Sequence, residues 1–177
     1  MSAPRKQSSR NNWETPQALF DLLHAEFHFT VDAAASEENA KCPVFWTEED
    51  NALEQDWDHH TVFCNPPYGK ANGDGLYGID KWLHKAHYAS EFGNTRAVVL
   101  TPCDPSTYWF SNYEAKATQI RLCCPRVHFV PPEGVKRSSP PATTAVWIFG
   151  PMWATERFDR MVLWRWSGAT EENDDES

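Results

Sequence analysis

The stretch TVFCNPPYGK spans residues 61–70 and places two consecutive prolines directly after a β-favouring run. Thr, Val and Phe favour strands, whereas a proline has no backbone N–H to donate to a sheet or a helix. We therefore predict a buried strand over 61–64, followed by a rigid NPPY segment at its carboxyl end. This segment is either a structural turn or a functional site, because ligands of open α/β sheets bind beyond the carboxyl ends of strands.

Helical and strand-like patterns alternate up to about residue 115, and strand-like patterns cluster after that point. Helices are predicted over residues 16–27, near 52–56, over 79–93 and over 104–115. Strands are predicted over residues 28–32, 61–64, 96–102, 118–124, 126–130 and 143–150. Alternating helices and strands favour a parallel sheet, and consecutive strands favour an antiparallel hairpin. The predicted fold class is α/β, with a mostly parallel sheet and an antiparallel hairpin at its C-terminal edge.

The first predicted helix has a clear start signal. Thr15 is the predicted N-cap, and Pro16 suits the first helical position, where a missing N–H costs nothing. The following strand is predicted to end at Asp32 and to run into the small residues AAAS.

Composition indicates one globular domain. Hydrophobic residues make up 41% of the 177 residues, which is enough to bury a core. We predict this domain over residues 11–166, between a flexible basic arm (1–10) and a disordered acidic tail (167–177).

The sequence shows no signal for export or membrane insertion. No apolar run approaches the about 18 residues needed to span a bilayer, and residues 1–10 contain no hydrophobic segment. The five cysteines form no CxxC pair, which indicates reduced thiols. We expect a cytoplasmic protein with no membrane partner, present as a monomer or a weak dimer.

Charge is divided unevenly along the chain, although the net charge is −9. Residues 11–100 contain 5 Lys and Arg against 15 Asp and Glu, whereas residues 116–165 contain 8 against 3. An acidic half thus precedes a basic half. This asymmetry permits binding of a nucleic acid on one face of the domain.

The NPPY segment suits transfer of a group to an amine whose lone pair is delocalised. Such an amine is a poor nucleophile, so acceptors must hold it with the lone pair aimed at the incoming group. The Asn65 side-chain carbonyl and the Pro66 backbone carbonyl would each accept one N–H. Tyr68 would stack an extruded planar group. The predicted catalytic residues are Asn65, Pro66, Pro67 and Tyr68.

An NPPY segment at a strand end resembles the catalytic motif of amino-group methyltransferases that use S-adenosylmethionine. The patterns W-x-TP-x-x-LFD-x-L (13–23), F-x-VDAAAS-x-x-NAKC (29–42), DNAL-x-x-DW (50–57) and VFCNPPYGK resemble more narrowly the phage-type DNA N6-adenine methyltransferases, the Dam-like family of phages and prophages. The runs KWLHKAHYASEFGNTRAVVLTP and RVHFVPPEG continue this resemblance, which covers roughly residues 12–150.

The resemblance implies a Rossmann-like methyltransferase domain encoded by a phage or prophage and acting in the bacterial host. It would transfer a methyl group from S-adenosylmethionine to the N6 amine of adenine in double-stranded DNA, after flipping the base into the NPPY site. Protection of DNA from restriction is one role for such methylation.

The resemblance also implies a set of cofactor residues. Thr15 would contact the methionine carboxylate, and Asp50 would bind the adenosine, with Asp56 as an alternative. DAAAS takes the place of the usual glycine-rich loop but contains no glycine, so its geometry must differ. The implied cofactor-binding residues are Trp13, Thr15, Pro16, Asp32, Ala33, Ala34, Ser36 and Asp50.

For DNA contact the sequence favours two loops, 69–78 and 131–142. Lys70 directly follows the NPPY segment, and Lys136 and Arg137 stand among Gly, Ser and Pro residues. Their positive charges would neutralise phosphates. The alternative is that both are ordinary charged surface loops.

Other interpretations remain open from the residues alone. As an alternative to a role in cofactor binding, Asp32 would only cap the segment that follows it. Asp50 would then be one residue of the solvated run EED. His84 and His87 share a helix face, but no further ligand completes a metal site, so we predict no metal. The same NPPY segment suits the N4 amine of cytosine or the amide of a protein glutamine. A catalytically inactive protein that only binds DNA or S-adenosylmethionine is the further alternative.

Overall fold

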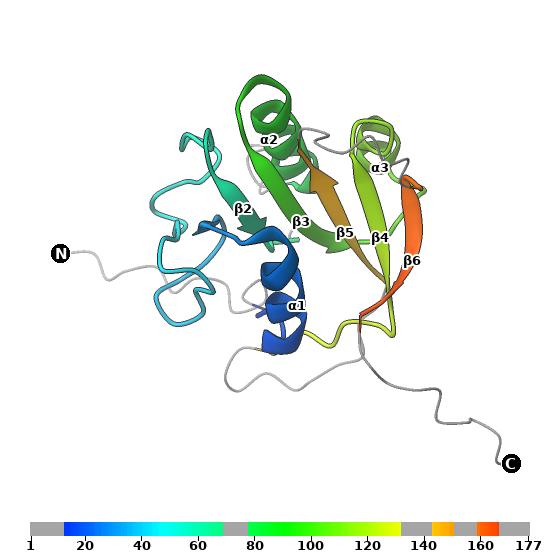
Figure 1. The fold of residues 1–177 in the computed structure, drawn as a ribbon, viewed down its shortest axis with the longest axis horizontal. Helices are drawn as coiled ribbons and strands as arrows, with labels where there is room; N and C mark the ends of the chain where they lie inside the picture. The colour runs from blue at the N-terminus through cyan, green and yellow to red at the C-terminus, as the bar shows by residue number, and fades with distance from the viewer. Residues whose placement is uncertain (1–12, 69–77, 132–142, 151–158, 167–177) are drawn as a thin grey trace, which may run out of the picture.

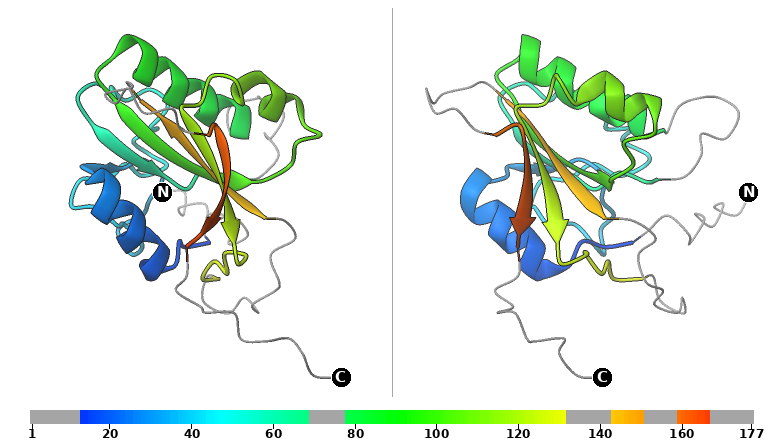
Figure 2. Two further views of the ribbon diagram at one scale, coloured as in Figure 1. Left: turned by 45° about the vertical axis from the view of Figure 1, so that its right-hand side comes forward. Right: turned by 90° about the vertical axis from the view of Figure 1, so that its right-hand side faces the viewer.

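The computed structural model describes residues 13–68, 78–131, 143–150 and 159–166 of the chain. Within these ranges the helices lie on both faces of one sheet (Figures 1 and 2). Helix α1 (Gln17–Phe27) covers one face, whereas α2 (Ile79–Phe92) and α3 (Tyr108–Tyr113) cover the other. None of these helices is long and apolar enough to cross a membrane.

The sheet of the described residues has six strands in the order β1-β2-β3-β5-β4-β6. The strands are β1 (Val31–Asp32), β2 (Thr61–Cys64), β3 (Arg96–Pro102), β4 (Gln119–Cys124), β5 (Thr144–Phe149) and β6 (Met161–Arg165). Strand β5 is antiparallel to both of its neighbours, and the other pairings are parallel. Five strands therefore end on one side of the sheet, called here the carboxyl edge, at Asp32, Cys64, Pro102, Cys124 and Arg165.

The mixed α/β sheet with mostly parallel strands is confirmed, and β2, α2 and β3 match their predicted ranges closely. The antiparallel hairpin exists between β4 and β5, but its predicted position at the edge of the sheet is wrong. Strand β5 lies inside the sheet, paired with β3 on one side and with β4 on the other, and all six of its residues are buried. The strand at the edge beyond β4 is β6, which alternates exposed and half-buried residues and for which no element was predicted.

The predicted strand over 126–130 is not part of the sheet. Both sides of β4 are already paired, with β5 and β6, so the chain after it finds no free strand edge there. Within this run Val130 forms an isolated bridge with Glu14. Val127 and Phe129 instead pack into the core on the α1 side.

Two predictions about helices also need correction. Thr15 does not cap α1, because Pro16 occupies the N-cap position with an extended backbone and the first helical residue is Gln17. Residues 52–56 form turns and no helix, and α3 is shorter than predicted. It is shorter because Asp104 accepts hydrogen bonds from the N–H and the hydroxyl of Ser106, which hold the chain in a turn before the helix starts.

Two hydrophobic cores lie on the two faces of the sheet, and they follow from the alternation of side chains along a strand. On β3, Ala97 and Val99 belong to the core under α2 and α3, whereas Val98 and Leu100 belong to the core under α1. Strand β5 divides its residues in the same way. The central strands are therefore buried on both faces. The polar residues at the carboxyl edge, among them Asp32 and Asn65, follow directly from this buried sheet.

Neighbouring leucines of α1 allow a direct test of this packing. Leu23 is 0% exposed, and Leu22 is 47% exposed. We expect Leu23→Ala to lower the free energy of unfolding by about 2 to 5 kcal/mol, because it leaves a cavity in the core under α1. Leu22→Ala should cost less than about 1 kcal/mol. Urea unfolding of both variants measures the difference, and equal losses would contradict this packing.

Candidate active site at the carboxyl edge

The NPPY segment begins at the carboxyl end of β2, as predicted, and its asparagine is held on both sides. Asn65 Nδ2 donates a hydrogen bond to the backbone carbonyl of Trp13, at 3.0 Å. Asn65 Oδ1 accepts one from the hydroxyl of Tyr68, at 2.7 Å. A carbonyl can only accept, so the contact with Trp13 fixes which end of the amide is nitrogen. The Asn65 oxygen therefore points toward Tyr68, with a second lone pair left for another donor.

The remaining residues of the segment differ in burial. Pro66 is buried, and Pro67 and Tyr68 are half-buried. The Tyr68 hydroxyl has a second acceptor within reach, the backbone carbonyl of Leu100 at 3.3 Å. Its ring contacts Phe129 edge to face, with the ring centroids 6.4 Å apart. Burial raises the pKa of the Tyr68 phenol well above its usual range, so this side chain is a neutral donor.

The N-terminal segment that carries Trp13 is tied to the site from two directions. Its carbonyl holds Asn65, and the backbone of Glu14 exchanges two hydrogen bonds with Val130, each at 2.9 Å. The indole ring of Trp13 is half-buried. Trp13 thus contributes its backbone to the site, a contact that sequence reasoning missed because only the side chain was considered.

Asp32 lies at the carboxyl end of β1 and is only 3% exposed. Its carboxylate accepts hydrogen bonds from the backbone N–H groups of Ala34, at 3.4 Å, and Lys41, at 3.1 Å. Burial raises its pKa to about 6, although both amides and the Lys41 charge pull in the other direction. Asp32 therefore closes the loop 33–41 upon itself.

The DAAAS segment continues the line of β1 beyond its last paired residue. The Ala33 N–H donates to the Phe63 carbonyl, and the Ala35 N–H donates to the Trp46 carbonyl. Ala33 is 1% exposed, and Ala34 and Ser36 are half-buried. The chain thus bends at Ala33 and Ala34 while it stays bonded to β2 and to residue 46, and it does so without glycine.

Asp50 stands apart from this cluster. It is exposed, and its Oδ2 accepts hydrogen bonds from the N–H and the hydroxyl of Thr47, each at 2.8 Å. These bonds lower the pKa of Asp50. The described contacts join Asp50 to its own turn and not to Asn65 or Asp32.

Two buried polar side-chain atoms have no hydrogen-bond partner among the described residues, Thr15 Oγ1 and Trp82 Nε1. Thr15 is 3% exposed and precedes α1, two residues after the carbonyl that holds Asn65. Trp82 is 5% exposed and lies in the first turn of α2, which runs back from the carboxyl edge to β3. A buried donor without a partner is costly. Sequence reasoning missed Trp82, whose only signal was its position in the helix after the NPPY segment.

Some predicted site residues are not described. Lys70, Lys136 and Arg137, with most of the two loops assigned to DNA contact, lie outside the described residues, as do the basic arm 1–10 and the acidic tail 167–177. No group of three metal-ligating side chains occurs in the part of the chain that the structure describes.

A mixed α/β sheet with an NPPY segment at a strand end is consistent with a methyltransferase-like fold. The family model described as DNA N-6-adenine-methyltransferase (Dam) matches residues 2–170, and the chain therefore belongs to this family.

Individual relatives agree with this assignment. A DNA N-6-adenine-methyltransferase of Escherichia phage T1 is 34% identical over 113 residues, covering 63% of this chain and 44% of the relative. A DNA N-6-adenine-methyltransferase of Haemophilus phage HP1 is 32% identical over 117 residues, covering 65% of this chain and 63% of the relative. A putative methyltransferase of Escherichia coli K12, YfdM, is 37% identical over 65 residues, covering 33% of this chain and 71% of the relative. The chain thus matches less than two thirds of the length of each phage relative.

The raised pKa of Asp32 predicts a pH dependence of stability. Between the unfolded pKa of about 4 and the folded pKa of about 6, the folded protein holds a proton that the unfolded chain has lost. Raising the pH through this window should therefore lower the free energy of unfolding, by roughly 3 kcal/mol in total. The contribution is fully present below about pH 4 and lost above about pH 6.

Asp32→Asn cannot titrate and should lack this component. Urea unfolding of both proteins between about pH 4 and about pH 7 gives the difference between their free energies of unfolding. The contributions of the other carboxylates are the same in both proteins and cancel in this difference. Parallel pH curves for the two proteins would contradict the assignment of a raised pKa to Asp32.

Proposed function

We propose that this chain transfers a methyl group from S-adenosylmethionine to the N6 amine of adenine in double-stranded DNA, with the target base flipped into the NPPY site. The observation that carries the proposal is the fixed orientation of Asn65, whose amide oxygen is presented at the carboxyl end of β2. Membership of the Dam family and the names of the phage relatives support DNA adenine as the substrate.

In this mechanism the chain acts by positioning the amine. Asn65 Oδ1 and the Pro66 carbonyl would each accept one N–H of the adenine amine and turn its lone pair toward the methyl group. The Tyr68 hydroxyl would move from Asn65 Oδ1 to the Leu100 carbonyl, which frees both lone pairs of the asparagine oxygen. Tyr68 would also stack on the flipped base. None of these groups needs to ionise, and the amine would release one of its two protons to solvent after it receives the methyl group.

The residues of the carboxyl edge fit S-adenosylmethionine, which would supply the electrophilic methyl group. The unpaired Thr15 hydroxyl supports a ligand at this place, because a buried donor calls for an acceptor such as the methionine carboxylate. Asp32 would act as a positioning residue that shapes the loop Ala33–Ser36. Asp50 uses Oδ2 within its own turn, and its Oδ1 would accept from the adenosine.

The catalytic role of Asn65 has a direct test. We expect Asn65→Ala to reduce formation of N6-methyladenine by at least about 100-fold, because one acceptor for the amine is lost. Mass spectrometry of nucleosides from unmethylated DNA incubated with the protein and S-adenosylmethionine measures this. Calorimetry should show unchanged cofactor binding. Full activity of the variant would overturn the mechanism, and N4-methylcytosine formed by the unaltered protein would overturn the base assignment.

The role of Thr15 in cofactor binding is tested by replacing Thr15 with valine and comparing the effect with the same replacement at another buried threonine. Thr15→Val removes an unpaired hydroxyl and should leave the stability of the protein alone unchanged or slightly higher. It should weaken binding of S-adenosylmethionine by about 10- to 100-fold, because a hydrogen bond to a charged group is lost.

The control is Thr95→Val at the opposite edge of the sheet. Thr95 is 0% exposed, and its hydroxyl donates to the Trp57 carbonyl at 2.5 Å. We expect this variant to lose about 1 to 3 kcal/mol of stability and to keep its cofactor affinity. Cofactor binding by Thr15→Val at the strength of the unaltered protein would remove Thr15 from the site.

A further inference from the structure

Helix α2 carries a row of exposed aromatic side chains. His84, Tyr88 and Phe92 follow one another at a spacing of four residues, which places them on one face of the helix. The rings of His84 and Tyr88 are stacked with their centroids 6.3 Å apart, and the centroids of Tyr88 and Phe92 are 4.8 Å apart. Tyr88 is 55% exposed, and Phe92 is 70% exposed. Single exposed apolar residues are ordinary, whereas a group of them in contact marks an interaction surface.

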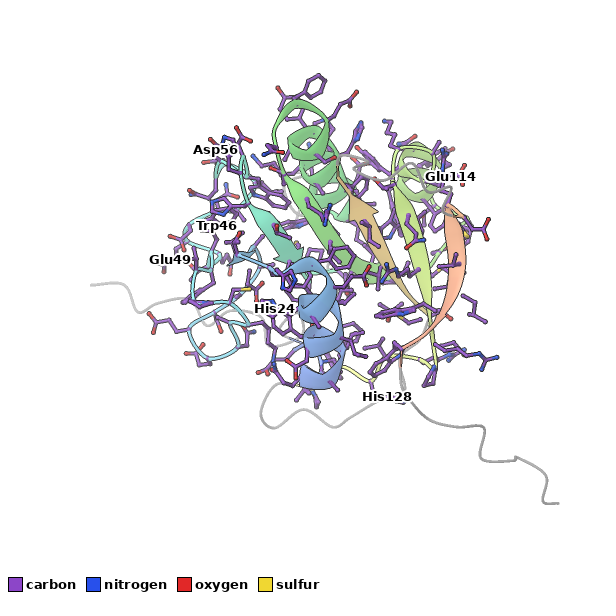
Figure 3. All side chains as sticks on the ribbon, viewed as in Figure 1. His24, Trp46, Glu49, Asp56, Glu114 and His128 are labelled. Atoms are coloured by element: carbon purple, nitrogen blue, oxygen red, sulfur yellow. The ribbon has the colours of Figure 1, made fainter. Side chains whose placement is uncertain are left out.

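The aromatic row lies on the outer side of the domain. The other face of α2 packs on the sheet through Trp82, Leu83, Ala86 and Ala89. Figure 2 shows α2 as the outermost layer on its side of the sheet, with no described helix or strand outside it. Figure 3 shows side chains that project from α2 beyond the ribbon of the sheet. The row is therefore open to a partner on the side where α2 faces away from the core.

The two ends of α2 differ in charge. At the N-terminal end, Lys81 is exposed and stands nearly in line with the aromatic row, whereas Asp80 is turned about 80° away from it. At the C-terminal end, Glu91 is exposed, and the last turn contains no basic residue. The unpaired carbonyls of a helix C-terminus add partial negative charge there. The exposed side of α2 thus runs from a positive to a negative end.

Two contacts describe the carboxylates at the negative end. Glu91 Oε2 lies 2.9 Å from His87 Nε2 of the same helix, and the Glu91 side chain is still 52% exposed. Asp58 Oδ1 accepts a hydrogen bond from the Asn94 N–H at 2.6 Å, directly after α2. Both carboxylates therefore remain accessible to a cation at this end of the helix.

A second copy of α2 is complementary to this surface when the two helices run antiparallel. A two-fold axis at Tyr88 brings the two Tyr88 rings together and sets His84 beside Glu91 and Phe92 of the second copy. Lys81 then stands beside the negative end of the second helix. The symmetry repeats each contact, so both positive ends meet negative ends and the aromatic rows meet in the middle. Parallel helices would place like charges side by side.

We propose that two copies of this chain associate through α2, with antiparallel helices and a two-fold axis at Tyr88. Tyr88 and Phe92 of both copies would bury on the order of 500 Å² in total, because an aromatic side chain carries about 150 to 250 Å². Stable complexes bury about 1,200 Å² or more, so we expect a weak dimer with a dissociation constant of about 10 to 300 µM. Tyr88 stands about 14 Å along the helix from the carboxyl edge, so the proposal does not depend on the proposed function.

The aromatic row is tested by sedimentation equilibrium of the full chain between about 5 and about 500 µM. We expect Tyr88→Gln and Phe92→Gln each to weaken dimer formation at least about tenfold, because each substitution removes two aromatic side chains from the interface. Leu22→Gln is the matched control. Leu22 is 47% exposed on α1, on the opposite face of the sheet, and its substitution should leave the dissociation constant unchanged. Equal melting temperatures of the variants would show that folding is intact.

Exchange of charge tests the antiparallel arrangement. His84→Glu sets a carboxylate beside Glu91 of the second copy, and Glu91→Lys sets an ammonium beside His84 and Lys81 of the second copy. Each should weaken dimer formation about threefold to tenfold. The two substitutions change the net charge in opposite directions, so general repulsion between copies would not explain a loss shared by both. The double variant His84→Glu/Glu91→Lys restores opposite charges and should dimerise more tightly than either single variant.

Three outcomes overturn the proposal. The first is an unaltered protein that stays monomeric over the whole concentration range. The second is a dimer that Tyr88→Gln and Phe92→Gln weaken no more than Leu22→Gln does. The third is a double charge variant that dimerises more weakly than both single variants, which would exclude the antiparallel register. The nucleoside assay is independent of these results, because N6-methyladenine formed per chain should be the same for Phe92→Gln and the unaltered protein.

Discussion

Parallel pairing of β1, β2 and β3 is the constraint on which the candidate site depends. Strands that run the same way end on the same side of a sheet, so Asp32 and Asn65 share one edge although 32 residues lie between them. The hydrogen bond from Asn65 to the Trp13 carbonyl then ties the N-terminal segment to that edge. Because Pro66 and Pro67 are the next two residues of the chain, the backbone after Asn65 has little freedom to change this geometry.

Sequence signals located the elements that end at a proline or a glycine. They failed for segments whose place in the sheet depends on which strand pairs with them. Strand β2 ends where the prolines begin, and α2 ends at Gly93, so both could be located from the sequence. The run 126–130 has equal strand propensity, but β4 already pairs on both sides and leaves it no partner. Strand β6 was missed for the converse reason, since its pairing with β4 supplies a partner that the five-residue run itself does not indicate.

The two aspartates assigned to the cofactor illustrate what a sequence cannot supply. Asp32 is buried with a raised pKa, and Asp50 is exposed with a lowered one, yet each is simply an aspartate beside small or polar residues. Burial depends on residues far along the chain, here β2 and the segment around residue 46. The unpaired atoms of Thr15 and Trp82 belong to the same category, because a missing partner is visible only in three dimensions.

The order of strands in the sheet converts an uneven charge along the chain into an uneven charge in space. The acidic half of the sequence carries β1, β2 and most of β3, and the basic half carries β4, β5 and β6, so the two halves meet where β3 pairs with β5. S-adenosylmethionine carries a positive sulfonium, and DNA carries negative phosphates. In the proposed reaction, a positively charged cofactor and a negatively charged duplex would be attracted to surfaces of opposite charge. The net charge of −9 therefore says little about affinity for DNA, because attraction depends on the charge that faces the duplex.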